Sequence, residues 1–181
     1  ETNTFSSTTV SMADYHVEEY VREMNLAAVK LARDLADEYT AKNPDKPRFV
    51  AGSVGPTNKT CSMSPDVNNP AYRALSYDEL AASYQQQMEA MLEGGVDAIL
   101  IEPIFDTLNA KAAIFAAEQA MKATGVEVPV MLSVTVSDIG GRTLSGQTLD
   151  AFLASVQHAN IFSVGLNCSF GARQLKPFLE Q

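Results

Sequence analysis

Short, almost wholly apolar segments alternate with amphipathic helical segments along this chain, and this alternation narrows its possible folds more than any other feature. A strand of a parallel sheet is buried on both faces and reads as a continuous apolar run, whereas the connecting helix shows a helical period. The apolar runs lie at residues 98–101, 128–136 and 161–166, and the helical segments that follow them at 107–122, 148–158 and 172–180. The pattern predicts an α/β fold with a parallel sheet covered by helices.

The first half of the chain extends the same pattern. Apolar residues recur at helical spacing across residues 13–42, which predicts one long amphipathic helix. Residues 48–54 form a short apolar run and predict a buried strand. The next helix is predicted at residues 76–93, because Ser76 and Glu79 have the spacing of a capping box.

Two architectures fit this order of elements, a (β/α)8 barrel and an open doubly wound sheet. The glycine-rich sequences that bind dinucleotides or nucleotide phosphates are absent. Polar or reactive residues lie at the ends of successive strands, and a barrel brings all such ends to one mouth. These residues are Asn3, Ser53, Glu102, Ser133 or Thr135, Asn167 and Cys168. The arrangement favours a barrel that is incomplete, with about five of the eight strands present.

Composition excludes several classes of function. The chain has 181 residues and a formal net charge of -9, which argues against binding to nucleic acid or to an anionic membrane surface. No apolar run is long enough to span a membrane, and no signal peptide opens the chain. Only two cysteines are present, far apart in sequence, so we expect reduced thiols and a cytoplasmic location.

Both ends of the chain look cut. The first residue is Glu1 rather than methionine, residues 1–5 read as the last part of a strand, and the helical pattern still continues at Gln181. We therefore expect residues 1–181 to be a single partial domain, truncated at both ends. A processed protein with trimmed tails is the alternative.

Five segments in a fixed order carry a resemblance to a known family. They are residues 1–5 (ETNTF), 55–58 (GPTN), 102–111 (EPIFDTLNAK), 141–148 (GRTLSGQT) and 165–168 (GLNC). Together they resemble the homocysteine-binding, zinc-dependent methyltransferase domain of cobalamin-dependent methionine synthase. The resemblance covers essentially the whole chain. It implies an incomplete (β/α)8 TIM barrel with roughly strands 2 to 6 and their helices.

The resemblance also implies a metal site. In that family three cysteines bind zinc, one after the sixth strand and an adjacent pair after the eighth, and Cys168 matches the first of them. A buried, inert cysteine is the alternative interpretation of a single thiol. No cysteine follows Cys168, and Cys61 lies in an earlier loop. We therefore expect this chain alone to bind zinc weakly or not at all.

Substrate-binding residues follow from the same comparison. Glu102 matches the position that binds the amino group of homocysteine, and a carboxylate suits an ammonium group. The alternative is a glutamate on the rim or a cap on the following helix. Asn3 and Ser133 lie at the ends of other strands, where they would meet a carboxylate or line the mouth.

The function that the resemblance implies is methyl transfer to homocysteine. The donor would be methylcobalamin, supplied ultimately by methyltetrahydrofolate, and the partners would be the cobalamin- and folate-binding domains of a longer parent chain. S-methylmethionine and betaine are alternative donors. A non-catalytic truncated folding unit is the rival interpretation, and exposed edge strands would allow such a unit to self-associate.

Overall fold

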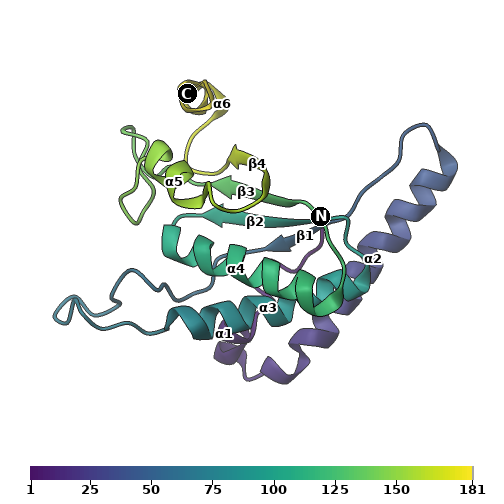
Figure 1. Ribbon diagram of the computed structural model, residues 1–181, viewed down its shortest axis with the longest axis horizontal. Coiled ribbons are helices and arrows are strands. Elements are labelled where there is room, and N and C mark those ends of the chain that lie inside the picture. Colours follow the sequence, from purple (N-terminus) through teal and green to yellow (C-terminus); the bar gives the residue numbers. More distant parts are fainter. Residues whose placement is uncertain (181) are drawn as a thin grey trace.

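A computed structural model describes residues 1–180 and contains one parallel four-stranded sheet in the order β1-β2-β3-β4. Figure 1 shows these strands side by side near the centre of the molecule. Their bounds are Ala51–Val54 for β1, Ala98–Ile104 for β2, Val130–Val134 for β3 and Ile161–Leu166 for β4. All three neighbouring pairs are parallel, which confirms the α/β fold with strands alternating with helices.

A helix follows each strand in turn. These helices are α3 (Tyr77–Gly94), α4 (Thr107–Thr124), α5 (Leu149–Val156) and α6 (Ala172–Leu179). The sequence predicted all four to within a few residues. Within residues 1–180 no helix is long and apolar enough to cross a membrane.

The capping box at the start of α3 is confirmed. Ser76 Oγ accepts a hydrogen bond from the Glu79 amide at 3.3 Å, and a Glu79 carboxylate oxygen accepts one from the Ser76 amide at 2.9 Å. The helix ends where Gly95 adopts a positive φ of 91°, a conformation that costs glycine little. Local sequence thus determines both ends of this helix.

The predicted single helix over residues 13–42 is wrong in its first part. The structure has a short α1 (Thr9–Met12), two 3-10 turns and then α2 (Val21–Lys42). His16 interrupts the chain with a left-handed φ of 58°. The apolar periodicity also misleads on burial, because Leu31 and Leu35 on α2 are 64% and 58% exposed. Periodicity alone does not reveal a turn inside an apolar pattern. It also does not show whether other elements cover the apolar face of a helix.

The strand predicted at residues 1–5 is also absent as a regular element. This segment nevertheless runs beside β1, because the Thr2 amide donates to the Ala51 carbonyl at 3.0 Å and the Gly55 amide donates to the Phe5 carbonyl at 2.9 Å. Between these bonds the Ser53 amide donates to a side-chain oxygen, Thr2 Oγ1, so the regular ladder is interrupted. The structure therefore has four strands and one irregular neighbour in place of five strands.

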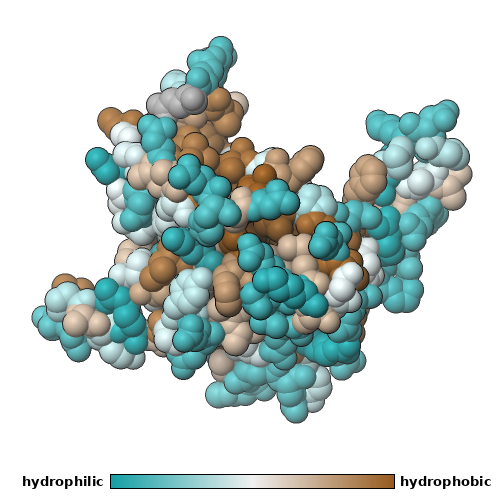
Figure 2. Space-filling view, viewed as in Figure 1, coloured by the Kyte–Doolittle hydropathy of each residue, from teal (hydrophilic) through white to brown (hydrophobic). Residues whose placement is uncertain are grey.

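The two faces of the sheet differ in burial. Ile99, Ile101 and Leu132 are almost fully buried and belong to one core with residues of α3 and α4. The alternate residues Leu100 and Met131 pair across the strands and are only half-buried. In a closed barrel this second face would line the interior. Figure 2 shows apolar side chains gathered near the middle of the view, over β3 and β4.

We predict that Ser76→Ala lowers the free energy of unfolding by about 1 kcal/mol, because it removes the hydroxyl that caps α3. Urea denaturation followed by circular dichroism would measure the change. Ser6→Ala is the matched control, since Ser6 is exposed and its side chain forms no hydrogen bond within residues 1–180. Equal stability of the two variants would contradict the prediction.

Candidate functional site

Glu102 and Ser133 lie close together at the carboxyl edge of the sheet. Ile101 pairs with Leu132 and Ile104 pairs with Val134, so two residues of β2 oppose the single Ser133 of β3. This irregularity is a bulge, and bulges re-aim side chains near sites. By strand alternation the Glu102 and Ser133 side chains occupy the same half-exposed face. Two of the predicted substrate-binding residues are thus brought together.

The Glu102 carboxylate lies in a partly dehydrated environment. Burial raises the pKa of Glu102, the neighbouring Glu1 carboxylate raises it further, and a hydrogen bond from Ser53 opposes the rise. Ser53 Oγ donates that bond to Glu102 Oε1 at 3.2 Å. An incoming cation would offset the burial and the repulsion from Glu1, and would favour the ionised form of Glu102.

Cys168 follows β4 at the same edge and is exposed. Both Cys168 and Ser169 have left-handed backbones, with φ of 56° and 51°, which is uncommon for residues other than glycine and clusters at functional sites. The residue before them is fixed, because the Asn167 amide donates to the Val134 carbonyl at 3.0 Å and Thr135 Oγ1 donates to Asn167 Oδ1 at 2.8 Å. The thiol therefore stands on a sharp turn that starts from a well-anchored point.

The residues described do not complete a zinc site. Among residues 1–180 no group of three or more His, Cys, Asp or Glu side chains lies close enough to hold a metal ion. Cys168 fits as one soft ligand, because it is exposed at a strand tip and a thiolate suits zinc. A tetrahedral site with an open position needs two further protein ligands.

Cys61 does not supply one of them. Its side chain is buried, and burial raises the pKa of the Cys61 thiol to about 11, with further contributions from the Asp106 and Glu79 carboxylates. A thiol with this pKa stays protonated at neutral pH and is a poor metal ligand. Cys61 therefore belongs to the packing of its loop.

Asn3 lies at the margin of the site. It is exposed, whereas its neighbours Thr2 and Thr4 are buried. Its side chain makes no hydrogen bond to Glu102, to Ser133 or to any other residue that the structure describes. Of the three predicted substrate-binding residues, Asn3 is the one that the structure does not join to the others.

The first turn of α4 holds the loop that follows β1. Asp106 caps the helix by accepting hydrogen bonds from the amides of Leu108 at 2.8 Å and Asn109 at 3.2 Å. Asn109 Oδ1 accepts from the Cys61 amide at 2.9 Å, and Asn109 Nδ2 donates to the Lys59 carbonyl at 3.1 Å. The role of Asn109 was not predicted from the sequence. An asparagine in the first turn of a helix was the available signal.

The same turn holds the loop that follows β3. Thr107 Oγ1 donates to Gln147 Oε1 at 3.0 Å, and the Thr107 amide donates to Ser145 Oγ at 3.2 Å. The Ser145 amide donates to the Phe105 carbonyl at 3.1 Å. These contacts fix the loop of residues 142–148 to the start of α4. Two loops of the site edge are therefore fixed to one helix start.

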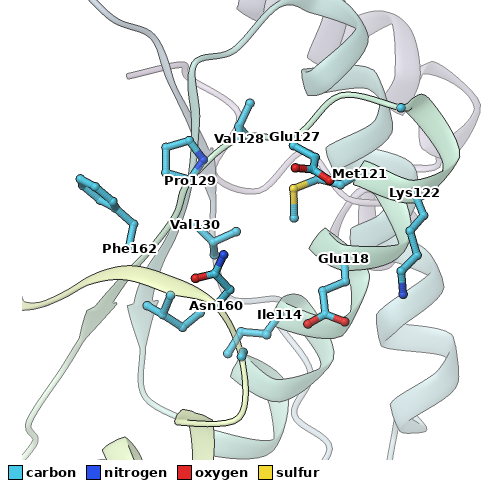
Figure 3. Close-up of a pocket in the computed structure, with 13 residues that line it drawn as sticks. Ile114, Glu118, Met121, Lys122, Glu127, Val128, Pro129, Val130, Asn160 and Phe162 are labelled. Carbon is cyan, nitrogen blue, oxygen red and sulfur yellow. The ribbon is translucent and has the colours of Figure 1, made fainter.

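A cavity of about 620 Å³ lies at the other end of the sheet. Figure 3 shows Ile114 and Met121 of α4 beside Val130 at the start of β3, with Glu118 and Lys122 on the α4 side. Chemistry in α/β folds is placed at the carboxyl ends of strands. The cavity is lined by strand starts, so it is separate from Glu102 and Ser133.

Four parallel strands, each followed by a helix, correspond to part of an α/β barrel, in which the carboxyl ends of the strands form the mouth. The family described as homocysteine S-methyltransferase matches residues 1–181. The chain therefore belongs to the homocysteine S-methyltransferase family.

Solved structures of the homocysteine methyltransferase MmuM from Escherichia coli have a similar fold. The metallated form is 22% identical, aligns over 92% of this chain and 56% of its own, and gives a TM-score of 0.73. The apo form is 22% identical, aligns over 86% and 52%, and gives a TM-score of 0.66. The chain thus spans about half the length of these proteins. At this identity the likeness shows the fold, a part of a TIM barrel.

We predict that iodoacetamide at pH 8 modifies Cys168 at least about tenfold faster than Cys61 in the folded protein. Cys168 is exposed, whereas Cys61 is buried with a pKa of about 11, and the thiolate is the reacting form. Mass spectrometry of the tryptic peptides would measure both rates. Labelling in urea is the control, since unfolding should make the rates similar. Equal labelling of the native thiols would contradict the burial of Cys61.

Proposed function

We propose that this chain forms the homocysteine-binding part of a methyltransferase that converts homocysteine to methionine. Membership of the homocysteine S-methyltransferase family carries the proposal. The geometry supports it, because Glu102 and Ser133 lie together on neighbouring strands at the carboxyl edge and Cys168 follows the next strand. The substrate would therefore meet its binding groups and its activating group at one mouth.

In this proposal Glu102 binds the α-ammonium group of homocysteine. Its carboxylate is half-buried on the open face of the sheet, and a charge-assisted hydrogen bond is stronger in such a place than in water. Ser133 and Asn3 are assigned to the carboxylate on the same α-carbon, to which a hydroxyl and an amide would donate. Both charged groups of the α-carbon would thus be held, with the thiol-bearing side chain directed along the mouth.

Cys168 is assigned as one zinc ligand, completed by two thiolates outside this chain. When bound, zinc lowers the pKa of a coordinated thiol, which in free form is near 8.5 and mostly protonated at neutral pH. In the proposed transfer the sulfur of homocysteine would form a bond to the methyl carbon. The bond between that carbon and the donor breaks with its electron pair left on the donor, and the thiol proton passes to solvent.

The proposed donor is methylcobalamin, recharged by methyltetrahydrofolate, on further domains of a longer cytoplasmic protein. The five ordered segments, residues 1–5 to 165–168, resemble the cobalamin-dependent branch of the family. S-methylmethionine or betaine is the alternative donor. Either donor would approach the same mouth, so the assignment of Glu102 does not depend on the choice.

A non-catalytic role of the chain by itself is the second candidate. β4 is the last strand of the sheet within residues 1–180 and its outer edge has no strand beside it. On this strand Phe162 is 72% exposed. Unpaired apolar edges favour pairing with another chain, so self-association through β4 is part of this second candidate.

The test of the proposed function is Glu102→Gln in a protein that contains this chain together with the rest of the barrel. The change removes the charge but keeps the shape. We predict that the KM for homocysteine rises about tenfold or more, because a hydrogen bond between ionised groups contributes about 1.5 kcal/mol or more. Methionine formation from methylcobalamin would measure it.

The matched control is Glu118→Gln, since Glu118 is another glutamate but lines the distant cavity. It should leave the KM unchanged. An unchanged KM in Glu102→Gln would remove Glu102 from the site. Turnover with S-methylmethionine or betaine but not with methylcobalamin would favour the alternative donors.

For the 181-residue chain alone, we predict zinc well below one equivalent after purification and mild chelation. Its described residues contain one suitable thiol and no cluster of three ligands, and a structural or catalytic zinc needs at least three. Elemental analysis would measure the content, with Cys168→Ser as the control for adventitious metal. Stoichiometric zinc that resists chelation would show that a complete site exists.

A further inference from the structure

Three buried residues form a closed ring of hydrogen bonds beside the site. The Ser53 amide donates to Thr2 Oγ1 at 3.0 Å, the hydroxyls of Thr2 and Thr4 lie 2.7 Å apart, and Thr4 Oγ1 donates to the Ser53 carbonyl at 2.6 Å. Thr2, Thr4 and Ser53 are 4%, 0% and 2% exposed. Little water reaches the ring, so its polar groups depend on one another.

The direction of every bond in the ring follows from counting protons. A hydroxyl has one proton, and Thr4 gives its proton to the Ser53 carbonyl. Thr2 must therefore donate to Thr4, while Thr2 itself accepts from the Ser53 amide. The bonds run in one sense around the ring, an arrangement in which each bond polarises the next.

The ring leaves the Ser53 side chain free to act outside it. Both backbone polar groups of Ser53 are bound to threonines, and its Oγ donates to Glu102 Oε1 at 3.2 Å. The ring is also anchored through Thr4, because Gln87 Nε2 of α3 donates to the Thr4 carbonyl at 2.7 Å. A path of hydrogen bonds through the buried residues Thr4 and Ser53 thus connects α3 to the half-buried Glu102 carboxylate.

We propose that Ser53 is a positioning residue, locked by the Thr2–Thr4 ring, that orients the Glu102 carboxylate for an ammonium ligand. The inference rests on the proposed role of Glu102 in homocysteine binding. Ser53 itself touches no substrate in this account. It fixes one carboxylate oxygen, Oε1, by a hydrogen bond.

The direct test is carbon-detected NMR titration of the Glu102 carboxyl in this chain. Ser53→Ala removes a donor to the ionised form, so the Glu102 titration midpoint should rise by about 0.5 or more. The Glu1 carboxylate and the N-terminal ammonium group also act on Glu102, and both are unchanged in this variant. Ser11→Ala is the matched control, because Ser11 is likewise buried but outside the ring. An unchanged midpoint in Ser53→Ala would overturn the proposal.

A second pair of variants tests the ring itself. Thr4→Val removes the hydroxyl at nearly constant shape and should raise the midpoint in the same direction, because the Ser53 backbone loses its clamp. Thr4→Ser keeps the hydroxyl and should restore the original value. A Thr4→Val midpoint equal to that of the unchanged protein would show that the ring does not position Ser53.

Kinetics separate this inference from the proposed function. With the complete barrel, Ser53→Ala should raise the homocysteine KM about threefold with little change in kcat. An NMR shift in Ser53→Ala with no KM effect of Glu102→Gln would overturn the role of Glu102 in homocysteine binding, while the Ser53 contact would stand. A raised KM in Glu102→Gln with no NMR shift in Ser53→Ala would overturn only the positioning role.

Discussion

The pairing of β2 with its two neighbours is the constraint on which the rest of the structure depends. β2 lies between β1 and β3, and strand alternation directs Ile99 and Ile101 into the core and Glu102 to the opposite face. Burial of this strand provides the hydrophobic stabilisation, and the same register decides where the carboxylate stands. A shift by one residue would bury the charge and expose the core.

Polar contacts then fix the loops and side chains at the carboxyl edge of the sheet. The first turn of α4 fixes the loops after β1 and β3 through Asn109 and Thr107, and the Thr2–Thr4 ring fixes Ser53 beside Glu102. These groups are buried and must be satisfied within the protein. Their hydrogen bonds therefore determine the shape of the mouth more strictly than apolar packing alone would.

Local and periodic features were predictable because their physics is local. The Ser76 capping box needs only residues close in sequence, and the apolar run ending at Glu102 identifies a buried strand with a carboxylate at its tip. The helix over residues 13–42 failed for the opposite reason. Packing against distant elements decides whether the chain turns at His16 or continues as a helix. The spacing of apolar residues contains no information about that packing.

The sequence by itself determined the α/β class, the alternation of the four strands with the helices that follow them, and the family, because these follow from periodicity and from ordered motifs. Only the tertiary structure decided that Glu102 and Ser133 share a face, that Cys61 is buried while Cys168 is exposed, and that Thr2 and Thr4 form a polar ring with Ser53 instead of belonging to a strand. Those outcomes depend on register, burial and hydrogen bonds between segments far apart in the sequence, which become defined only when the chain has folded.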